Sequence, residues 1–124
     1  MNADKEITKS GFMKVAPIIF LCEQQGRPED ELKQLFSGYF KSELAVSSAF
    51  LLRVKYGSSA EQQVALCIRG DGLDRHALLE HTSRIFRAMF NTEQSLDIIF
   101  LNSEQEQQAL SIGKPFYIQT ARQA

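Results

Sequence analysis

The fold is decided by residues 46–70, which read VSSAFLLRVKYGSSAEQQVALCIRG. Large apolar residues alternate with smaller or polar ones over residues 46–56, and the alternation returns over 64–68. A period of two residues is typical of β-strands, in which successive side chains point to opposite faces. Because Gly57-Ser58-Ser59 breaks the pattern, the segment predicts a β-hairpin with a loop of several residues.

A strand and a helix are predicted on each side of this hairpin. Before it, the apolar run within residues 14–22 predicts a strand, and Pro28 opens a helix whose apolar residues recur on one face. The residues of that face are Leu32, Leu35, Phe36, Tyr39 and Phe40. After the hairpin, helical spacing predicts a helix over 74–90, and an apolar run predicts a strand over 96–101.

Helix caps mark where the later helices begin. Asp71 or Asp74 can cap the helix over 74–90. The tetrapeptide Ser103-Glu104-Gln105-Glu106 matches a capping box, so a short third helix is predicted to begin there and to end at Gly113. The Phe116-Tyr117-Ile118 segment that follows is a short apolar tail that must dock on the rest of the domain.

The order strand, helix, strand, strand, helix, strand is typical of the ferredoxin-like fold. We therefore expect an α+β sandwich with a four-stranded, mainly antiparallel sheet, two helices on one face, and a short C-terminal helix and tail. The second sheet face needs a cover, because the strands over 14–22 and 96–101 are apolar on both sides. The third helix and the tail are the preferred cover, and another subunit is the alternative. On that face the hairpin is expected to present Ser47, Ala49, Leu51, Arg53, Ala65, Cys67 and Arg69.

Length and composition indicate one globular domain. The chain has 124 residues and a net charge of -1, so it lacks the positive field that nucleic acid or anionic lipid requires. We find no secretory signal and no apolar run long enough to cross a bilayer, and we expect a cytoplasmic protein. Cys22 and Cys67 are predicted to be reduced core thiols. The expected organisation is a flexible polar segment over 1–13, a single domain over 14–118 and a polar tail over 119–124.

No residue pattern indicates a catalytic centre, a metal site or a cofactor. His76 and His81 lie about 140° apart around a helix, so they cannot hold one metal ion together. No serine lies in a GxSxG turn, and no glycine group forms a phosphate-binding loop. The residues expected on the second face carry no aromatic ring on which an RNA base could stack. Asp97 stands alone among apolar residues, and a bond to a nearby amide is the preferred interpretation.

Four segments carry a resemblance to a known family. They are the proline-led helix over 28–40, Val46-Ser47-Ser48-Ala49-Phe50-Leu51, Asp97-Ile98-Ile99-Phe100-Leu101, and Lys114-Pro115-Phe116-Tyr117. Over about residues 14–118 the chain resembles the C-terminal domain of the SseB (enhanced serine sensitivity) family. The resemblance implies a bacterial, cytoplasmic protein, and the family supplies no catalytic residues. Many members carry a preceding N-terminal domain, so the chain is expected to be either a single-domain relative or a fragment.

We expect a non-enzymatic interaction or adaptor domain that binds a protein partner, or a second copy of itself, through the second sheet face and the C-terminal tail. The candidate interaction residues are Leu51, Arg53, Asp97, Lys114, Pro115, Phe116 and Tyr117. The alternative is a regulatory domain that senses a small molecule, such as an amino acid, at a dimer interface. An enzyme is the third hypothesis, and it requires a cleft that gathers Asp97, a histidine and a cysteine.

Overall fold

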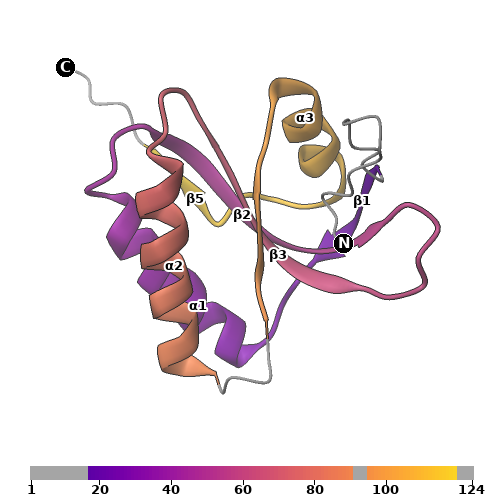
Figure 1. Ribbon diagram of the computed structural model, residues 1–124, viewed down its shortest axis with the longest axis horizontal. Helices are drawn as coiled ribbons and strands as arrows, with labels where there is room; N and C mark the ends of the chain where they lie inside the picture. Colours follow the sequence, from indigo (N-terminus) through magenta and orange to yellow (C-terminus); the bar gives the residue numbers. More distant parts are fainter. Residues whose placement is uncertain (1–16, 91–94, 120–124) are drawn as a thin grey trace, which may run out of the picture.

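The computed structural model describes residues 17–90 and 95–119 (Figure 1). Its elements in chain order are β1 (Ile18–Glu23), α1 (Arg27–Phe40), β2 (Val46–Tyr56), β3 (Gln63–Gly70), α2 (Arg75–Met89), β4 (Asp97–Phe100), α3 (Ser103–Ile112) and β5 (Tyr117–Ile118). The α+β class and the predicted order of elements are confirmed, and β5 is an additional strand. The predicted N-terminal segment 1–13 lies outside the described residues, as do residues 120–124 of the predicted tail.

The strands form one mixed sheet in the order β1-β2-β3-β4. β1 and β3 pair antiparallel with β2, whereas β4 pairs parallel with β3. The predicted ferredoxin-like topology is therefore not confirmed, because the order of elements along a chain leaves open which strands pair. The two longest strands, β2 and β3, are central, and β1 lies at an edge. Pro17, which has no N–H to donate, directly precedes β1 and suits this edge position.

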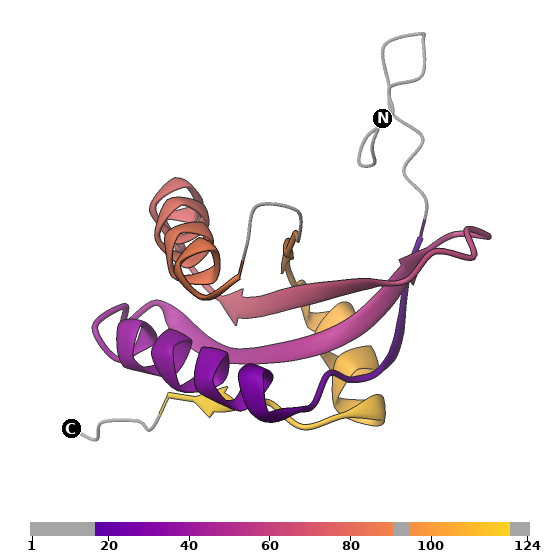
Figure 2. The same cartoon turned by 90° about the horizontal axis from the view of Figure 1, so that it is seen from below.

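Helices cover both faces of the sheet: α1 and α2 lie on one side of the strands and α3 on the other (Figure 1), and Figure 2 gives the view from below. We call the core under α1 and α2 the first cluster; its buried members are Leu32, Phe36, Phe40, Val46, Ala49, Leu51, Leu66, Ile68, Leu78, Phe86 and Tyr117. The second cluster lies under α3; its buried members are Phe50, Leu52, Val54, Ala65, Cys67, Ile99, Leu101 and Ala109. The prediction that both longer helices pack on the same sheet face is confirmed.

The second sheet face is covered by α3, as predicted, but only some of the residues predicted for it lie there. Ala65 and Cys67 of β3 do, whereas Ala49 and Leu51 of β2 lie under α1 and α2. Phe50 lies opposite Cys67, and Leu51 lies opposite Leu66. Because residues directly opposite each other share a face, Cys67 belongs with Phe50 under α3, whereas Leu51 belongs under α1 and α2. The alternation within one strand shows which of its own residues share a face, but it leaves open how two strands are registered. Both faces are covered by the chain's own helices.

The C-terminal tail docks at the sheet edge and not, as predicted, on the second face. β5 pairs antiparallel with Ser48 and Ala49 of β2, along the same edge that β1 occupies further on. Three further backbone bonds line this edge: Gln24 N to Leu51 O at 2.9 Å, Phe116 N to Ala49 O at 2.9 Å, and Gln119 N to Ser47 O at 2.8 Å. β1 and β5 therefore share one edge of β2.

The cap of α3 lies one residue before the predicted capping box. The Asn102 side chain accepts from the Gln105 N–H at 2.8 Å, and the Gln105 side chain accepts from the Asn102 N–H at 2.9 Å. Asparagine caps a helix as well as serine does, and glutamine serves at the third helical position as glutamate does. The predicted pair of Ser103 and Glu106 is therefore not used as a cap, and Glu106 is free for another role.

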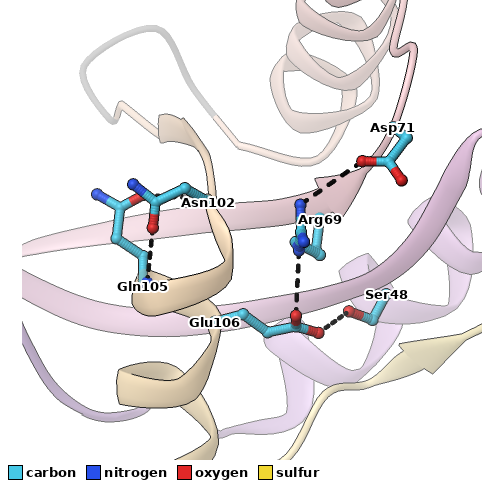
Figure 3. A network of polar contacts seen from close by, with 6 residues as sticks. All are labelled: Ser48, Arg69, Asp71, Asn102, Gln105 and Glu106. Atoms are coloured by element: carbon cyan, nitrogen blue, oxygen red, sulfur yellow. Dashed lines mark hydrogen bonds and ion pairs between the residues drawn. The ribbon is translucent and has the colours of Figure 1, made fainter.

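Glu106 fixes α3 to the sheet through the polar network of Figure 3. Its carboxylate accepts from Arg69 Nε of β3 at 3.1 Å and from Ser48 Oγ of β2 at 3.5 Å. α3 itself buries only Ala109 completely, so its apolar contact with the sheet is small. Charge-assisted hydrogen bonds are stronger than neutral ones, and this network supplements the small apolar contact.

Candidate interaction surface

The C-terminal tail has one buried aromatic residue and, next to it, one exposed apolar residue. Tyr117 is 9% exposed, and its hydroxyl donates to the Phe40 carbonyl at 3.2 Å. The Phe116 ring lies 6.4 Å, between centroids, from the rings of both Phe36 and Phe40 in α1. Ile118, the next residue along, is 64% exposed. The tail is therefore anchored beneath α1 while it presents a strand edge and an apolar side chain to the surface.

A groove runs between the outer flank of α1 and β5. It consists of two adjoining hollows of about 570 and 490 Å³ that share Ser37, Lys41 and Phe116 in their walls. We call it the α1–β5 groove; its remaining lining residues are Asp30, Lys33, Gln34, Gly38, Leu44, Tyr117, Ile118 and Gln119. Gln119 fixes one end, since its side-chain amide donates to the carbonyls of Leu44 at 2.7 Å and Val46 at 3.0 Å.

The groove combines exposed apolar side chains with positive charge. Leu44 is 73% exposed beside the exposed Ile118. Neither Lys33 nor Lys41 forms an ion pair with a carboxylate within residues 17–90 and 95–119, and Asp30 is the one acidic residue that lines the described groove. An apolar surface bordered by unneutralised lysines can contact a ligand that carries both apolar groups and negative charge.

The other predicted interaction residues do not lie in this groove. Leu51 is 1% exposed in the first cluster, so its side chain cannot reach a partner. Arg53 lies further along β2, where its guanidinium donates to Gln24 Oε1 at 2.8 Å and to Gln62 Oε1 at 3.5 Å. Asp97 begins β4, beyond β3 from β2. Of the seven predicted residues, only Phe116 and Tyr117 line the groove, and Lys114 and Pro115, which precede them, line neither hollow.

Among the residues that the structure describes, Asp97 is bonded to a tyrosine hydroxyl and not to the predicted amide. The Tyr56 hydroxyl donates to Asp97 Oδ2 at 2.6 Å. Burial, followed by this hydrogen bond, raises the pKa of Tyr56 well above its ordinary value. Burial, followed by the charge of Asp97, raises the pKa of the Cys67 thiol to about 12. Both groups are therefore protonated at neutral pH, which is the unreactive form of a cysteine nucleophile.

The two histidines lie away from Cys67. His81 stacks on Tyr39 with 4.0 Å between ring centroids and an interplanar angle of 8°, which joins α2 to α1. α2 covers the sheet face opposite the one on which Cys67 lies, and His76 is exposed on the same helix. Within the described part of the chain, no three histidine, cysteine, aspartate or glutamate side chains gather as metal ligands would. The cleft that the enzyme hypothesis requires is not formed by these residues.

The family model described as the SseB protein C-terminal domain matches residues 19–119. The chain belongs to this family. The match begins inside β1 and ends directly after β5, so the SseB C-terminal domain includes the tail strand that closes the edge of β2. Neither the curated proteins nor the solved structures contain a match to the chain. None of the helices described for this SseB domain is long and apolar enough to span a membrane.

Of the residues that line the groove of this SseB domain, only Phe116 and Tyr117 were predicted as interaction residues, and those not predicted include Lys33, Lys41, Leu44 and Ile118. Periodicity places both lysines on the outer face of the predicted helix, where charge is ordinary and marks no site. Leu44 was the one available signal, because it is a large apolar residue between a helix and a strand. The groove is created by the docking of the tail beside α1, and no local sequence pattern predicts that position.

Proposed function

We propose that this chain is a non-enzymatic protein-interaction domain that binds another protein along the α1–β5 groove. The observation that carries the proposal is the opposite exposure of neighbouring residues in β5, with Tyr117 at 9% and Ile118 at 64%. A strand of two residues has little stability alone, but here a buried aromatic anchor holds it. The exposed neighbour is thereby presented at a fixed position, which lowers the entropy lost on binding.

The exposed apolar residues at one end of the groove support the same interpretation. Leu44 and Ile118 line a single hollow together with Phe116. Single exposed apolar residues are ordinary, whereas adjacent ones in a hollow are typical of contact sites. The second sheet face has no part in this proposal, because α3 covers it and Leu51 lies on the other side.

Site-specific photo-crosslinking tests the proposal. A photoreactive phenylalanine analogue replaces Ile118 or Leu44 in the groove, and in the control it replaces Leu110, which is 45% exposed on α3. After irradiation in cells that produce the chain, we expect the same partner peptide to be identified by mass spectrometry in adducts from positions 118 and 44, and no adduct from position 110. Equal adducts from all three positions, or none from any, would contradict the proposal.

Two further measurements separate the alternatives. Ile118→Asp should leave the Tm within about 2 °C, because an exposed substitution changes stability little, and it should abolish the adduct from position 44. An adduct that joins two copies of the chain would assign the groove to a homodimer and overturn the proposal of another protein. A rise in Tm with one member of an amino-acid panel that includes serine would favour the small-molecule sensor instead.

A further inference from the structure

We infer that the α1–β5 groove binds an extended, acidic peptide segment of the partner, which adds to β5 as a further strand. The inference rests on the proposed function and names the chemistry of the partner. It is argued from two independent features of the groove, the backbone of β5 and the charge on α1.

The backbone of β5 is paired on one side within the described residues. The Gln119 N–H bonds to Ser47 of β2, and Ile118 is the residue opposite Ser48. The bond from Gln119 N–H to the Ser47 carbonyl frames Ser48 and Ile118 as a pair that exchanges no hydrogen bonds, so the N–H of Ile118 points away from β2. The alternation does not extend back to Phe116, whose N–H also bonds to β2. β5 has no other strand partner among residues 17–90 and 95–119. An unpaired strand edge is a template on which an extended peptide can form main-chain hydrogen bonds.

The charge on α1 selects the side chains of such a peptide. Residues opposite each other in an antiparallel pair point to the same face, so the peptide residue opposite Tyr117 points toward α1, as Tyr117 does. Lys33 and Lys41 line this side of the groove without an ion-pair partner among the described residues. Lys33 lies in α1 and Lys41 is its C-cap, so the two residues are about 12 Å apart along the helix axis at 1.5 Å per residue. Acidic residues four positions apart in an extended strand span about 13 Å and match that distance.

The same lysines argue against a second copy of the chain as the occupant. In a two-fold symmetric pairing of β5 with β5, each copy would bring its own Lys33 and Lys41 to the shared groove. Like charges placed together reduce affinity, and Asp30 alone lines the groove with the opposite charge. A helical occupant would have no free main-chain groups to offer to Ile118, since a helix satisfies its own. The extended acidic segment is the occupant that uses both features.

Fluorescence anisotropy with purified protein tests the inference. The probe is a fluorescein-labelled eight-residue peptide that alternates valine and glutamate, and the charge control alternates valine and lysine. We expect saturable binding of the glutamate peptide and at least about tenfold weaker binding of the lysine peptide, because two opposite-charge contacts become repulsive. N-methylation of alternate backbone amides in the glutamate peptide should weaken binding at least about tenfold, because it removes main-chain donors.

Variants of the protein locate the contact. Lys33→Glu combined with Lys41→Glu should weaken binding of the glutamate peptide at least about tenfold. The control Arg84→Glu, on the exposed side of α2, makes a change of the same sign and should leave binding within about twofold. Circular dichroism checks that every variant is folded. Equal binding of the two peptides, or no effect of N-methylation, overturns the inference.

The two proposals fail separately. If the crosslinks from positions 118 and 44 persist but the glutamate peptide does not bind, the groove contacts a folded surface and the strand-addition inference is wrong. If the peptide binds the groove but no partner is crosslinked there in cells, the proposed function is wrong while the binding chemistry stands.

Discussion

Replacing Tyr117 with alanine should remove much of the domain's free energy of unfolding, although the residue lies in a short tail. The ring is 9% exposed, its centroid lies 5.5 Å from that of Phe40, and its hydroxyl donates to the Phe40 carbonyl. Truncating a buried aromatic side chain to alanine costs about 3–5 kcal/mol. Tyr117→Phe removes only the hydrogen bond and should cost about 0.5–1.5 kcal/mol.

Urea unfolding followed by circular dichroism measures these changes in the free energy of unfolding. The matched control is Ile118→Ala, one residue along the same strand, where a 64% exposed side chain should change the stability by less than about 0.5 kcal/mol. A Tyr117→Ala variant that loses less than about 1 kcal/mol, or no more than the control, would refute the view that the tail belongs to the core.

This prediction decides how binding data on the tail can be interpreted. The whole stability of a domain is about 5–15 kcal/mol, so Tyr117→Ala can abolish binding by unfolding the chain. Variants of Ile118 change the exposed side of the same strand and keep the fold. A binding defect in Ile118 variants that is absent in Tyr117→Phe therefore identifies a contact.

The remaining predictions concern backbone packing and the two thiols. Gly70→Ala places a Cβ against the Ala45 carbonyl oxygen and should cost about 1–3 kcal/mol or more in urea unfolding, whereas Gly38→Ala, with open space around it in α1, should stabilise by about 0.5–1 kcal/mol. Cys67 is buried as predicted, but Cys22, also predicted as a core thiol, is exposed. A thiol reagent at neutral pH should therefore modify Cys22 and spare Cys67 until the chain is unfolded, and modification of both in the native state would contradict the burial of Cys67. Burial raises the pKa of Cys67 from 9.0 to about 12, so between these two pH values only the thiol of the unfolded chain ionises. The free energy of unfolding should therefore fall by up to about 1.4 kcal/mol per pH unit above pH 9. Cys67→Ala should reduce this dependence of stability on pH.

Local pattern was enough to predict most elements of this domain. The apolar stripe that includes Phe36 and Phe40 identified α1 and its buried face, because a helix with one apolar side packs that side inward. Gly113 marked the end of α3, and Asp74 caps α2 by accepting from the Ala77 N–H at 3.1 Å. These signals act within a few residues, so one sequence contains them in full.

Pairing and register could not be predicted in the same way. A register shift between Val46 and Ser48 places Val46 in the first cluster, although strict alternation would put it with Phe50. Such a bulge depends on the opposite strand, where the backbone around Gly70 approaches Ala45 closely. The α1–β5 groove was predicted only in its tail residues for a related reason: its lysines and its tail strand are brought together by tertiary contacts, which no local pattern records.

The shared edge of β2 has a consequence for the way the chain reaches its native state. The contact between Tyr117 and Phe40 joins residues 77 positions apart, so a long loop must close before β5 docks. Until β5 docks, the start of β2 has no strand partner on this side, and an unpaired strand edge is a template for association with other incompletely folded chains. We therefore expect a chain whose β5 is not docked to self-associate more readily than the native domain.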